Sequence, residues 1–415
     1  MAIDTNDFLG SIMAPQKSHT DIMVMGVGGA GGNAVAHMYD LGIQGVSFMI
    51  CNTDRQALEK SPIENRLQLG PGLGAGNNPE KGRALALEAL DDIMLSLEES
   101  KAQMIFITAG MGGGTGTGAA PIIAKAAKSK GLLTVAIVTL PFSYEGPIRK
   151  KQALAGLEEL KACTDSLVVI HNDNISKMYG SLPITEALHK ADDVLATAAK
   201  GMAEMITRPD FINVDLEDAR TTMTDSGMAL MGSAKASGED RVESVVDAAL
   251  TSPLLNQPDI RGARKILVNL SYATEDTITF DEAMKVVSLI QSRASKTRDS
   301  QEANIIWGAG PSNTLDRGEI EITVIATSFE QPASEENRAE ESTPQQEERS
   351  DIQWNYTERY NNIDDILMQP AYLRRNMQLI GATSATRSQV DKSLATDHHS
   401  AENNAPKAAD QTLFG

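Results

Sequence analysis

Short apolar runs alternate with helical patterns over the first part of the chain. A continuous apolar run bounded by turn residues is typical of a buried strand. Such runs are Asp21–Met25, Gly45–Ile50, Met104–Ala109, Leu132–Leu140 and Ser166–Ile170. The segments between them, including Pro79–Leu97 and Ala119–Ala127, have helical character. This alternation predicts a parallel α/β sheet, whose ligand would lie at the carboxyl ends of the strands.

One long helix is predicted over Ile184–Thr207. Pro183 precedes it and Arg208-Pro209 ends it. Apolar residues recur along it at helical spacing, and such a stripe is typical of a core helix rather than a cofactor site. The stripe consists of Ile184, Leu188, Ala191, Leu195, Ala198, Met202 and Met205.

After this helix the pattern changes to that of a second, α+β domain over residues 208–329. Its predicted elements are Met228–Ser233, Arg241–Leu250, Lys265–Ser271, Phe280–Gln291, Asn304–Trp307 and Glu319–Thr327. Apolar Ile320 and Ile322 alternate with Glu319 and Glu321, which indicates a sheet with one wetter face. Few candidate nucleophiles or metal clusters occur here, so a structural domain is expected.

The two ends of the chain lack such patterns. Residues 1–20 read as a flexible leader, and residues 330–362 are rich in Glu, Gln, Ser and Asn, which predicts a disordered linker. Apolar residues return in 363–375, a candidate partner-binding peptide, although a stray apolar cluster in a tail is the alternative. Residues 376–415 read as a disordered extension, to which we assign no function.

The composition restricts the partners and the compartment. The formal net charge of −19 argues against nucleic acid or an anionic membrane as an electrostatic partner. Only Cys51 and Cys163 are present, too few for a disulfide framework. We find no signal pattern and no apolar run of about 18 residues, so a cytoplasmic protein without membrane insertion is expected.

The most informative stretch is Gly110–Gly118, where glycines follow a predicted strand and precede a helix. Missing Cβ atoms allow a tight bend in which successive N–H groups approach a polyanion. Pro121 is expected in the first turn of the helix, whose positive dipole end would face the same anion. A flexible linker is the alternative, but linkers are not normally fixed between a strand and a helix. The stretch lacks the lysine of P-loop enzymes.

A second glycine motif follows the first predicted strand. Gly26-x-Gly28-x-x-Gly31 is the dinucleotide fingerprint, and Asp54 lies about where that fingerprint expects a ribose-binding acid. An NAD-dependent oxidoreductase is therefore one possible interpretation. No catalytic His or Lys constellation accompanies it. Further loops at 72–79, 141–149 and 171–173 are also expected at the carboxyl edge of the predicted sheet. A single dinucleotide site would not need so many loops.

The order of these motifs and the stretch Gly112–Gly118 resemble the tubulin/FtsZ family of GTPases, over roughly residues 20 to 327. The resemblance implies a GTP-binding domain over 21–183 and a central helix over 184–207. It implies that GTP phosphates are held by Gly28, Gly29, Ala30, Gly31, Gly32 and Asn33, by Gly112, Gly113, Gly114, Thr115, Gly116, Thr117 and Gly118, and by Ala75 and Gly76 near the γ-phosphate. Magnesium would be bound through phosphates and water rather than directly by side chains. Turn or helix capping is the alternative role of Thr117.

The resemblance also assigns contacts to the rest of the nucleotide. Glu145 and Arg149 would contact ribose and base-proximal groups, and Asn172 the ribose. Asp193 would accept hydrogen bonds from guanine. Each residue also has a structural alternative. Glu145 and Arg149 would form only a surface ion pair, Asn172 would cap a turn, and Asp193 would be an acid on a solvated helix face. Leu188 replaces a stacking aromatic and Asp192 a common Asn, which makes guanine selectivity less secure than phosphate binding.

By the same resemblance, hydrolysis depends on Asn213, Asp215 and Asp218, which would orient the attacking water. These residues follow the long helix, which spans roughly 36 Å at 1.5 Å per residue. They would therefore serve the nucleotide of a neighbouring subunit in a head-to-tail filament. The alternative is that Asp215 and Asp218 only cap the next helix.

The resemblance finally implies a role and partners. The chain would be a self-assembling cytoskeletal GTPase that forms a cytokinetic ring at the mid-cell division site. Pro370, Tyr372, Leu373 and Arg374 would bind membrane-tethering division proteins such as FtsA, although Gln369 departs from the usual residue. A nucleotide-binding polymer with little hydrolysis remains an alternative.

Overall fold

The computed structural model describes residues 20–43, 45–174, 183–207, 212, 214–252, 260–274, 278–295 and 303–329. Of residues 184–192 only the helical backbone is described. The leader, the linker, the partner peptide with Pro370, Tyr372, Leu373 and Arg374, and the extension lie outside these residues, as does Asn213. All described residues belong to one compact unit of the chain.

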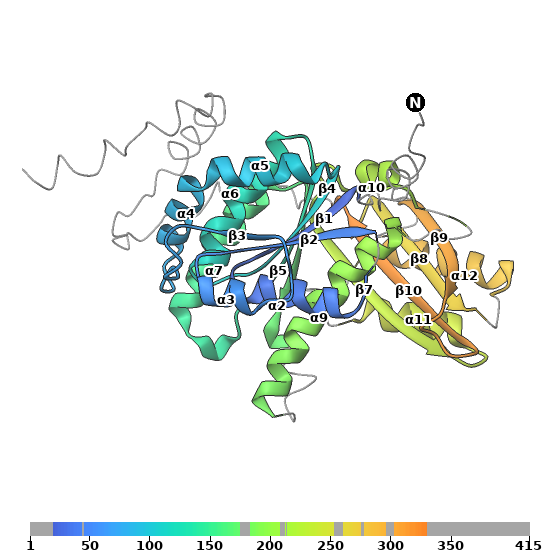
Figure 1. The fold of residues 1–415 in the computed structure, drawn as a ribbon. Coiled ribbons are helices and arrows are strands. Elements are labelled where there is room, and N and C mark those ends of the chain that lie inside the picture. The colour runs from blue at the N-terminus through green and yellow to red at the C-terminus, as the bar shows by residue number, and fades with distance from the viewer. Residues whose placement is uncertain are drawn as a thin grey trace, which may run out of the picture. The chain divides into compact units, whose positions relative to one another are not determined.

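A mixed sheet runs through the described part of the chain, with strands in the order β3-β2-β1-β4-β5-β6-β7-β10-β8-β9 (Figure 1). From β3 to β7 every neighbouring pair is parallel. These strands are β1 Ile22–Val27, β2 Val46–Asn52, β3 Arg66–Gln68, β4 Met104–Gly110, β5 Leu133–Leu140, β6 Ser166–His171 and β7 Gly227–Ser237. The sequence predicts the parallel pairing for β1, β2, β4, β5 and β6, but it does not predict β3 and it assigns the β7 segment to the second domain.

Helices cover both faces of the parallel strands, with α2 and α9 on one face and α4, α5 and α6 on the other (Figure 1). Their bounds are α2 Gly28–Asp40, α3 Arg55–Lys60, α4 Pro79–Glu88, α5 Leu90–Ser100, α6 Thr115–Ser129, α7 Pro147–Cys163 and α9 Ile184–Thr207. The short 3-10 helix η1 is Ser143–Glu145. Strands β1 and β4 are almost completely buried, which explains their continuous apolar sequence.

The C-terminal strands form the antiparallel part of the sheet. β10 (Glu319–Thr327) pairs antiparallel with both β7 and β8 (Lys265–Ala273), and β9 (Asn304–Ser312) pairs parallel with β8. Helices α11 (Arg241–Leu250) and α12 (Phe280–Ala294) pack beside them, and α10 (Leu216–Met223) follows α9. Ile320 and Ile322 are fully buried while Glu319 and Glu321 are partly exposed, which confirms the predicted alternation.

Two expectations about helices are wrong. The helix expected over Pro79–Leu97 is two helices, because the chain turns at Ala89 between α4 and α5. The helix after the central glycine stretch begins at Thr115, so Pro121 lies in its interior and not in its first turn. Both cysteines are buried, and Cys163 is the last residue of α7. Burial raises the pKa of the Cys51 thiol.

Candidate functional site

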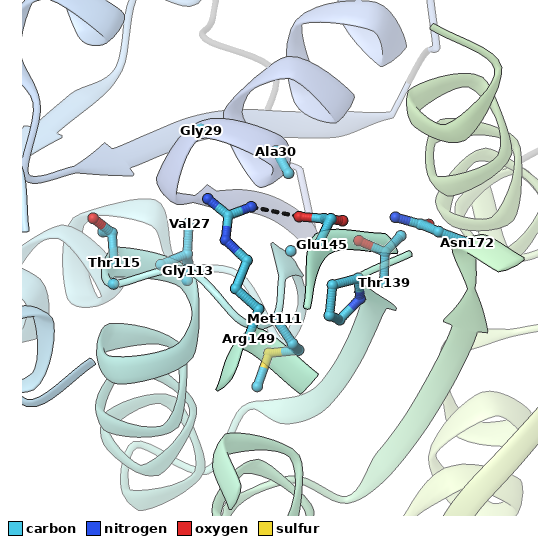
Figure 2. A pocket seen from close by; sticks show the side chains of 14 residues that line it. Val27, Gly29, Ala30, Met111, Gly113, Thr115, Thr139, Glu145, Arg149 and Asn172 are labelled. Carbon is cyan, nitrogen blue, oxygen red and sulfur yellow. Dashed lines mark hydrogen bonds and ion pairs between the residues drawn. The ribbon is translucent and has the colours of Figure 1, made fainter. Parts of the chain in front are cut away.

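A cavity of about 270 Å³ lies at the carboxyl ends of the parallel strands (Figure 2). The cavity is lined by residues of β1 and α2, of β4 and α6, of β5, η1 and the start of α7, and by Asn172, which follows β6. Its lining residues are Val27, Gly29, Ala30, Gly110, Met111, Gly113, Gly114, Thr115, Gly116, Thr139, Pro141, Glu145, Arg149 and Asn172. The two glycine stretches, η1 with Glu145 and the first turn of α7 with Arg149 thus converge on one cavity.

Two helices begin at this cavity with no side-chain cap on their first N–H groups. Val27 is the N-cap of α2 and Gly114 is the N-cap of α6, and neither provides a side-chain hydrogen bond. Neither helix has an acidic residue in its first turn. The first amides of a helix need acceptors, and the dipole favours an anion there. The arrangement is therefore that of a phosphate-binding site.

The glycines of the two stretches have different roles. A Cβ at Gly31 would lie 2.2 Å from the Thr108 carbonyl oxygen, and one at Gly118 would lie 2.0 Å from the Pro79 carbonyl oxygen. These glycines allow helices to pack closely on a strand or on another helix. A Cβ at Gly29 or Gly113 would meet nothing within 4 Å. Only some of the glycines are therefore free to face a ligand.

The two threonines of the central stretch also differ. The buried Thr117 hydroxyl accepts a hydrogen bond of 2.8 Å from the Gly112 N–H, so it stabilises the turn, the alternative role expected from the sequence. Thr115 lines the cavity, and its hydroxyl lies 2.6 Å from that of Thr53. Thr53 is a residue that sequence reasoning missed.

Glu145 and Arg149 both line the cavity and form an ion pair with each other (Figure 2). Glu145 also accepts a hydrogen bond of 2.9 Å from the Phe142 N–H, which fixes η1. The ion pair and the place in the site, which the sequence presented as alternatives, therefore coexist. The guanidinium supplies a positive charge beside the helix N-termini.

Asn172 lies at the end of β6, on the side of the cavity away from Thr115 in the view of Figure 2. Its Oδ1 atom is buried and has no hydrogen-bond partner among the described residues. A buried acceptor without a partner is suited to a ligand donor such as a sugar hydroxyl. Next to it, hydrogen bonds from Ser143 hold the pKa of Asp173 below its usual value and tie this edge to η1.

Other predicted site residues surround the cavity without lining it. Gly28, Gly31, Gly32, Asn33, Ala75, Gly76, Gly112, Thr117 and Gly118 are in this group. The loop that carries Ala75 lies against the central stretch, since a Cβ at Gly114 would be 2.7 Å from the Ala75 Cβ. Five lining residues were not predicted as site residues: Val27, Gly110, Met111, Thr139 and Pro141. These five residues lie at or just after the carboxyl ends of strands, and this position in the sequence could have indicated that they line the cavity.

Asp193 does not line the cavity. Its Oδ1 lies 3.1 Å from His37 Nε2 on α2, and the two side chains are 30% and 38% exposed. Asp54 also stays outside the cavity, because its side chain accepts the Gln56 N–H and caps α3. The acid that the dinucleotide interpretation assigns to the ribose is therefore the N-cap of α3 instead.

Asp215 and Asp218 form a capping box at the start of α10. The Asp215 side chain accepts the Asp218 N–H at 2.7 Å, and the Asp218 side chain accepts the Asp215 N–H at 3.2 Å. They lie at the amino edge of the parallel strands, opposite the cavity. This placement follows because α9 ends at Thr207, which lies beside Gly45 just before β2 begins. The capping alternative is thus realised, and the acids are separated from the cavity of their own chain.

No cluster of three or more His, Cys, Asp or Glu side chains suitable for a metal ion occurs among the described residues. In the part of the chain that the structure describes, the side-chain oxygens that line the cavity belong to Thr115, Thr139, Glu145 and Asn172, and Glu145 is the only carboxylate among them. Such a donor set fits a magnesium ion that keeps its waters and binds mainly through phosphate oxygens.

An open parallel sheet with a polar cavity at its carboxyl edge and two uncapped helix N-termini facing it defines a nucleotide-binding α/β protein. Comparison with known proteins agrees. Residues 21–180 match the model of the Tubulin/FtsZ family GTPase domain, and residues 227–330 match that of the FtsZ family C-terminal domain. The chain belongs to the Tubulin/FtsZ family of GTPases.

Relatives and solved structures extend the match over most of the chain. The cell division protein FtsZ of Porphyromonas gingivalis is 42% identical over 320 residues, covering 76% of this chain and 68% of the relative. FtsZ of Aquifex aeolicus is 43% identical over 313 residues, covering 74% and 83%. An empty FtsZ dimer of M. jannaschii is similar at 37% identity with a TM-score of 0.68, covering 79% of this chain and 92% of that one. Within the described part of the chain, no helix combines the length and the hydropathy needed to cross a bilayer.

Proposed function

We propose that this protein is a GTPase of cell division that assembles head to tail and hydrolyses GTP at the contact between subunits. The relatives that it resembles are named cell division proteins, and one solved relative is a dimer. The observation that carries the proposal is the separation of the cavity from Asp215 and Asp218, which lie at opposite edges of the parallel strands.

Within one chain, the proposed phosphate contacts come from the first turns of α2 and α6. The main-chain N–H groups would bind the phosphate oxygens, while Arg149, which is paired with Glu145, would add guanidinium N–H donors. Asn172 Oδ1 would accept from a ribose hydroxyl. Magnesium, held by phosphate oxygens and water near Thr115, would neutralise charge that develops on the phosphates.

The reaction needs a water molecule aligned with the terminal phosphate, and carboxylates can orient such a water. In the proposed filament, Asp215 and Asp218 of one subunit approach the cavity of the next. A contact between two different edges of the same molecule is head-to-tail, and where its rotation does not close into a ring it generates an open filament. Asn213 would act in the same loop and lies outside the described residues.

A nucleotide-binding polymer with little hydrolysis is the second candidate. The capping box favours it, because both acids already have a structural role. Asp215→Asn separates the two candidates better than alanine does, since asparagine caps helices as well as aspartate but carries no charge. Glu217→Gln is the matched control, because Glu217 is a neighbouring exposed acid in the first turn of α10.

Phosphate release with GTP and magnesium, measured together with light scattering over a dilution series, tests the proposal. We expect the rate per subunit to rise with protein concentration. Asp215→Asn should assemble and hydrolyse on the order of 100-fold more slowly, while Glu217→Gln should behave as the wild type. A rate per subunit that stays constant on dilution would refute hydrolysis at the contact, and full activity of Asp215→Asn would exclude a catalytic carboxylate at that position.

The cellular part of the proposal concerns residues outside the described structure. Residues 363–375, with Pro370, Tyr372, Leu373 and Arg374, would bind a membrane-tethering division protein such as FtsA and so bring filaments to the mid-cell division site. Removal of residues 363–415 should leave GTP hydrolysis unchanged and abolish co-sedimentation with the tether. Unchanged co-sedimentation would place the binding segment elsewhere.

A further inference from the structure

Thr53 connects two parts of the nucleotide site. It follows β2 directly and is 1% exposed. Its hydroxyl lies 2.6 Å from that of Thr115, the first residue of α6. Its main-chain carbonyl accepts a hydrogen bond of 2.8 Å from the Gly74 N–H. One buried residue therefore contacts both the start of a phosphate-facing helix and the 74–78 loop.

The 74–78 loop has a second attachment to the same helix start. A Cβ at Gly114 would lie 2.7 Å from the Ala75 Cβ and 2.9 Å from the Asn78 nitrogen, so the loop and the α6 N-cap are in direct contact. Asn78 in turn caps α4 through the N–H groups of Glu80 and Lys81. The 74–78 loop is thus fixed by Thr53 on one side and by its contact with Gly114, the N-cap of α6, on the other.

The close contact between two hydroxyls restricts what Thr115 can offer to a ligand. A threonine hydroxyl has one proton to donate and two lone pairs to accept. If Thr53 donates, the Thr115 proton is directed away from Thr53. If Thr115 donates, both of its lone pairs remain available to a ligand and are directed away from the shared proton. Without the Thr53 hydroxyl, the Thr115 hydroxyl would rotate among several orientations and would no longer present one fixed donor or acceptor to the cavity.

We propose that Thr53 is a positioning residue that, by orienting the Thr115 hydroxyl and holding the 74–78 loop, lets the site distinguish a nucleoside triphosphate from a diphosphate. This inference rests on the proposed binding of GTP. Thr115 lines one side of the cavity and Asn172 another, as Figure 2 shows, and the 74–78 loop contacts Gly114, which precedes Thr115. A ligand whose sugar contacts Asn172 would extend its phosphates toward Thr115. A change at Thr115 would therefore affect binding of the outermost phosphate most, and so affect a triphosphate more than a diphosphate.

The test compares the affinity of the full chain for GTP and for GDP by calorimetry with magnesium present. Thr53→Val keeps the shape and removes the hydroxyl, and Thr53→Ser keeps the hydroxyl. We expect the ratio of GTP to GDP affinity to fall about tenfold in Thr53→Val and to stay within about twofold of wild type in Thr53→Ser. Thr134→Val is the control, because Thr134 is equally buried but donates to the Leu132 carbonyl at the other edge of the sheet.

A double-mutant cycle then separates positioning from general structural support. If Thr53 acts through Thr115, Thr53→Val adds no further loss of the ratio in a Thr115→Val background. Should Thr53→Val fail to fold, Thr53→Cys provides the same readout, since a thiol is a much weaker donor of similar size.

Three results would overturn the inference: an unchanged ratio in Thr53→Val, equal losses of affinity for GTP and GDP, or additive losses in the cycle. Each of these can occur while the wild type binds GTP. A wild type that binds neither nucleotide would instead refute the proposed function itself.

Discussion

The contact between α4 and α6 makes a prediction whose size follows from the geometry. A Cβ added at Gly118 would lie 2.0 Å from the Pro79 carbonyl oxygen and 2.7 Å from the Arg83 nitrogen, both main-chain atoms. Ordinary contact begins at 3.4 Å, so Gly118→Ala requires α4 to move by about 1.4 Å. Over-packing of this kind costs about 3 kcal/mol, and the better helix propensity of alanine returns about 1 kcal/mol. The net loss is about 2 kcal/mol.

The matched control is Gly32→Ala on α2, where an added Cβ would meet nothing within 4 Å. There the gain in helix propensity should stand alone, about 1 kcal/mol. Thermal unfolding followed by circular dichroism should show Gly118→Ala melting about 4 °C below the wild type and Gly32→Ala at or slightly above it. If Gly118→Ala melts at or above the wild type, the two helices do not approach as closely in solution as the structure shows.

Two further predictions concern charged pairs. The hydrogen bonds from Arg241 hold the pKa of Glu282 at about 2, below its ordinary 4.5, so the pair stabilises the fold above about pH 4.5 and the contribution is lost as the pH falls toward 2. Glu282→Gln should remove about 1–2 kcal/mol of this acid-sensitive stability in denaturation curves at pH 3 to 7, and an unchanged pH profile would contradict the pairing. Lys128 lies 2.9 Å from the buried Asp165 and 2.7 Å from Asp225. Lys128→Met should cost about 1–3 kcal/mol in urea denaturation, and addition of Asp165→Asn should recover part of it; no recovery would show that the buried charge is not the cause.

The parallel strands and the long helix were predictable because their apolar patterns are set by burial on both faces or on one stripe. α9 begins and ends at the predicted Ile184 and Thr207, where proline signals coincide with the limits of the stripe. α11 and β10 were also predicted with the observed bounds, Arg241–Leu250 and Glu319–Thr327. In each case local propensity and tertiary burial favour the same element.

Helix starts within the glycine stretch were not predictable in the same way. Glycine and proline locally disfavour a helix, so the sequence suggested a later start than Thr115 and a first-turn place for Pro121. The glycines are nevertheless needed inside α6, since a Cβ at Gly116 would lie 2.4 Å from the Gly110 carbonyl oxygen. Close packing between elements, which no local pattern reports, overrides propensity there. The same limit applies to Thr53, whose partner Thr115 is remote in sequence.

The acids at α10 show why a residue's chemistry can be predicted when its role cannot. The sequence offered capping and catalysis as alternatives for Asp215 and Asp218, and the capping box satisfies the first. A carboxylate has two oxygens, however, and the box engages Oδ1 of Asp215 and Oδ2 of Asp218. Hydrogen bonding to main-chain N–H groups also limits rotation of both carboxylates. Such restriction would favour a group that orients water in a neighbouring molecule, because less conformational entropy is lost when the contact between subunits forms. For the proposed catalytic role, capping would therefore preorganise the two acids, and loss of the charge alone, in Asp215→Asn, is the change that separates capping from catalysis.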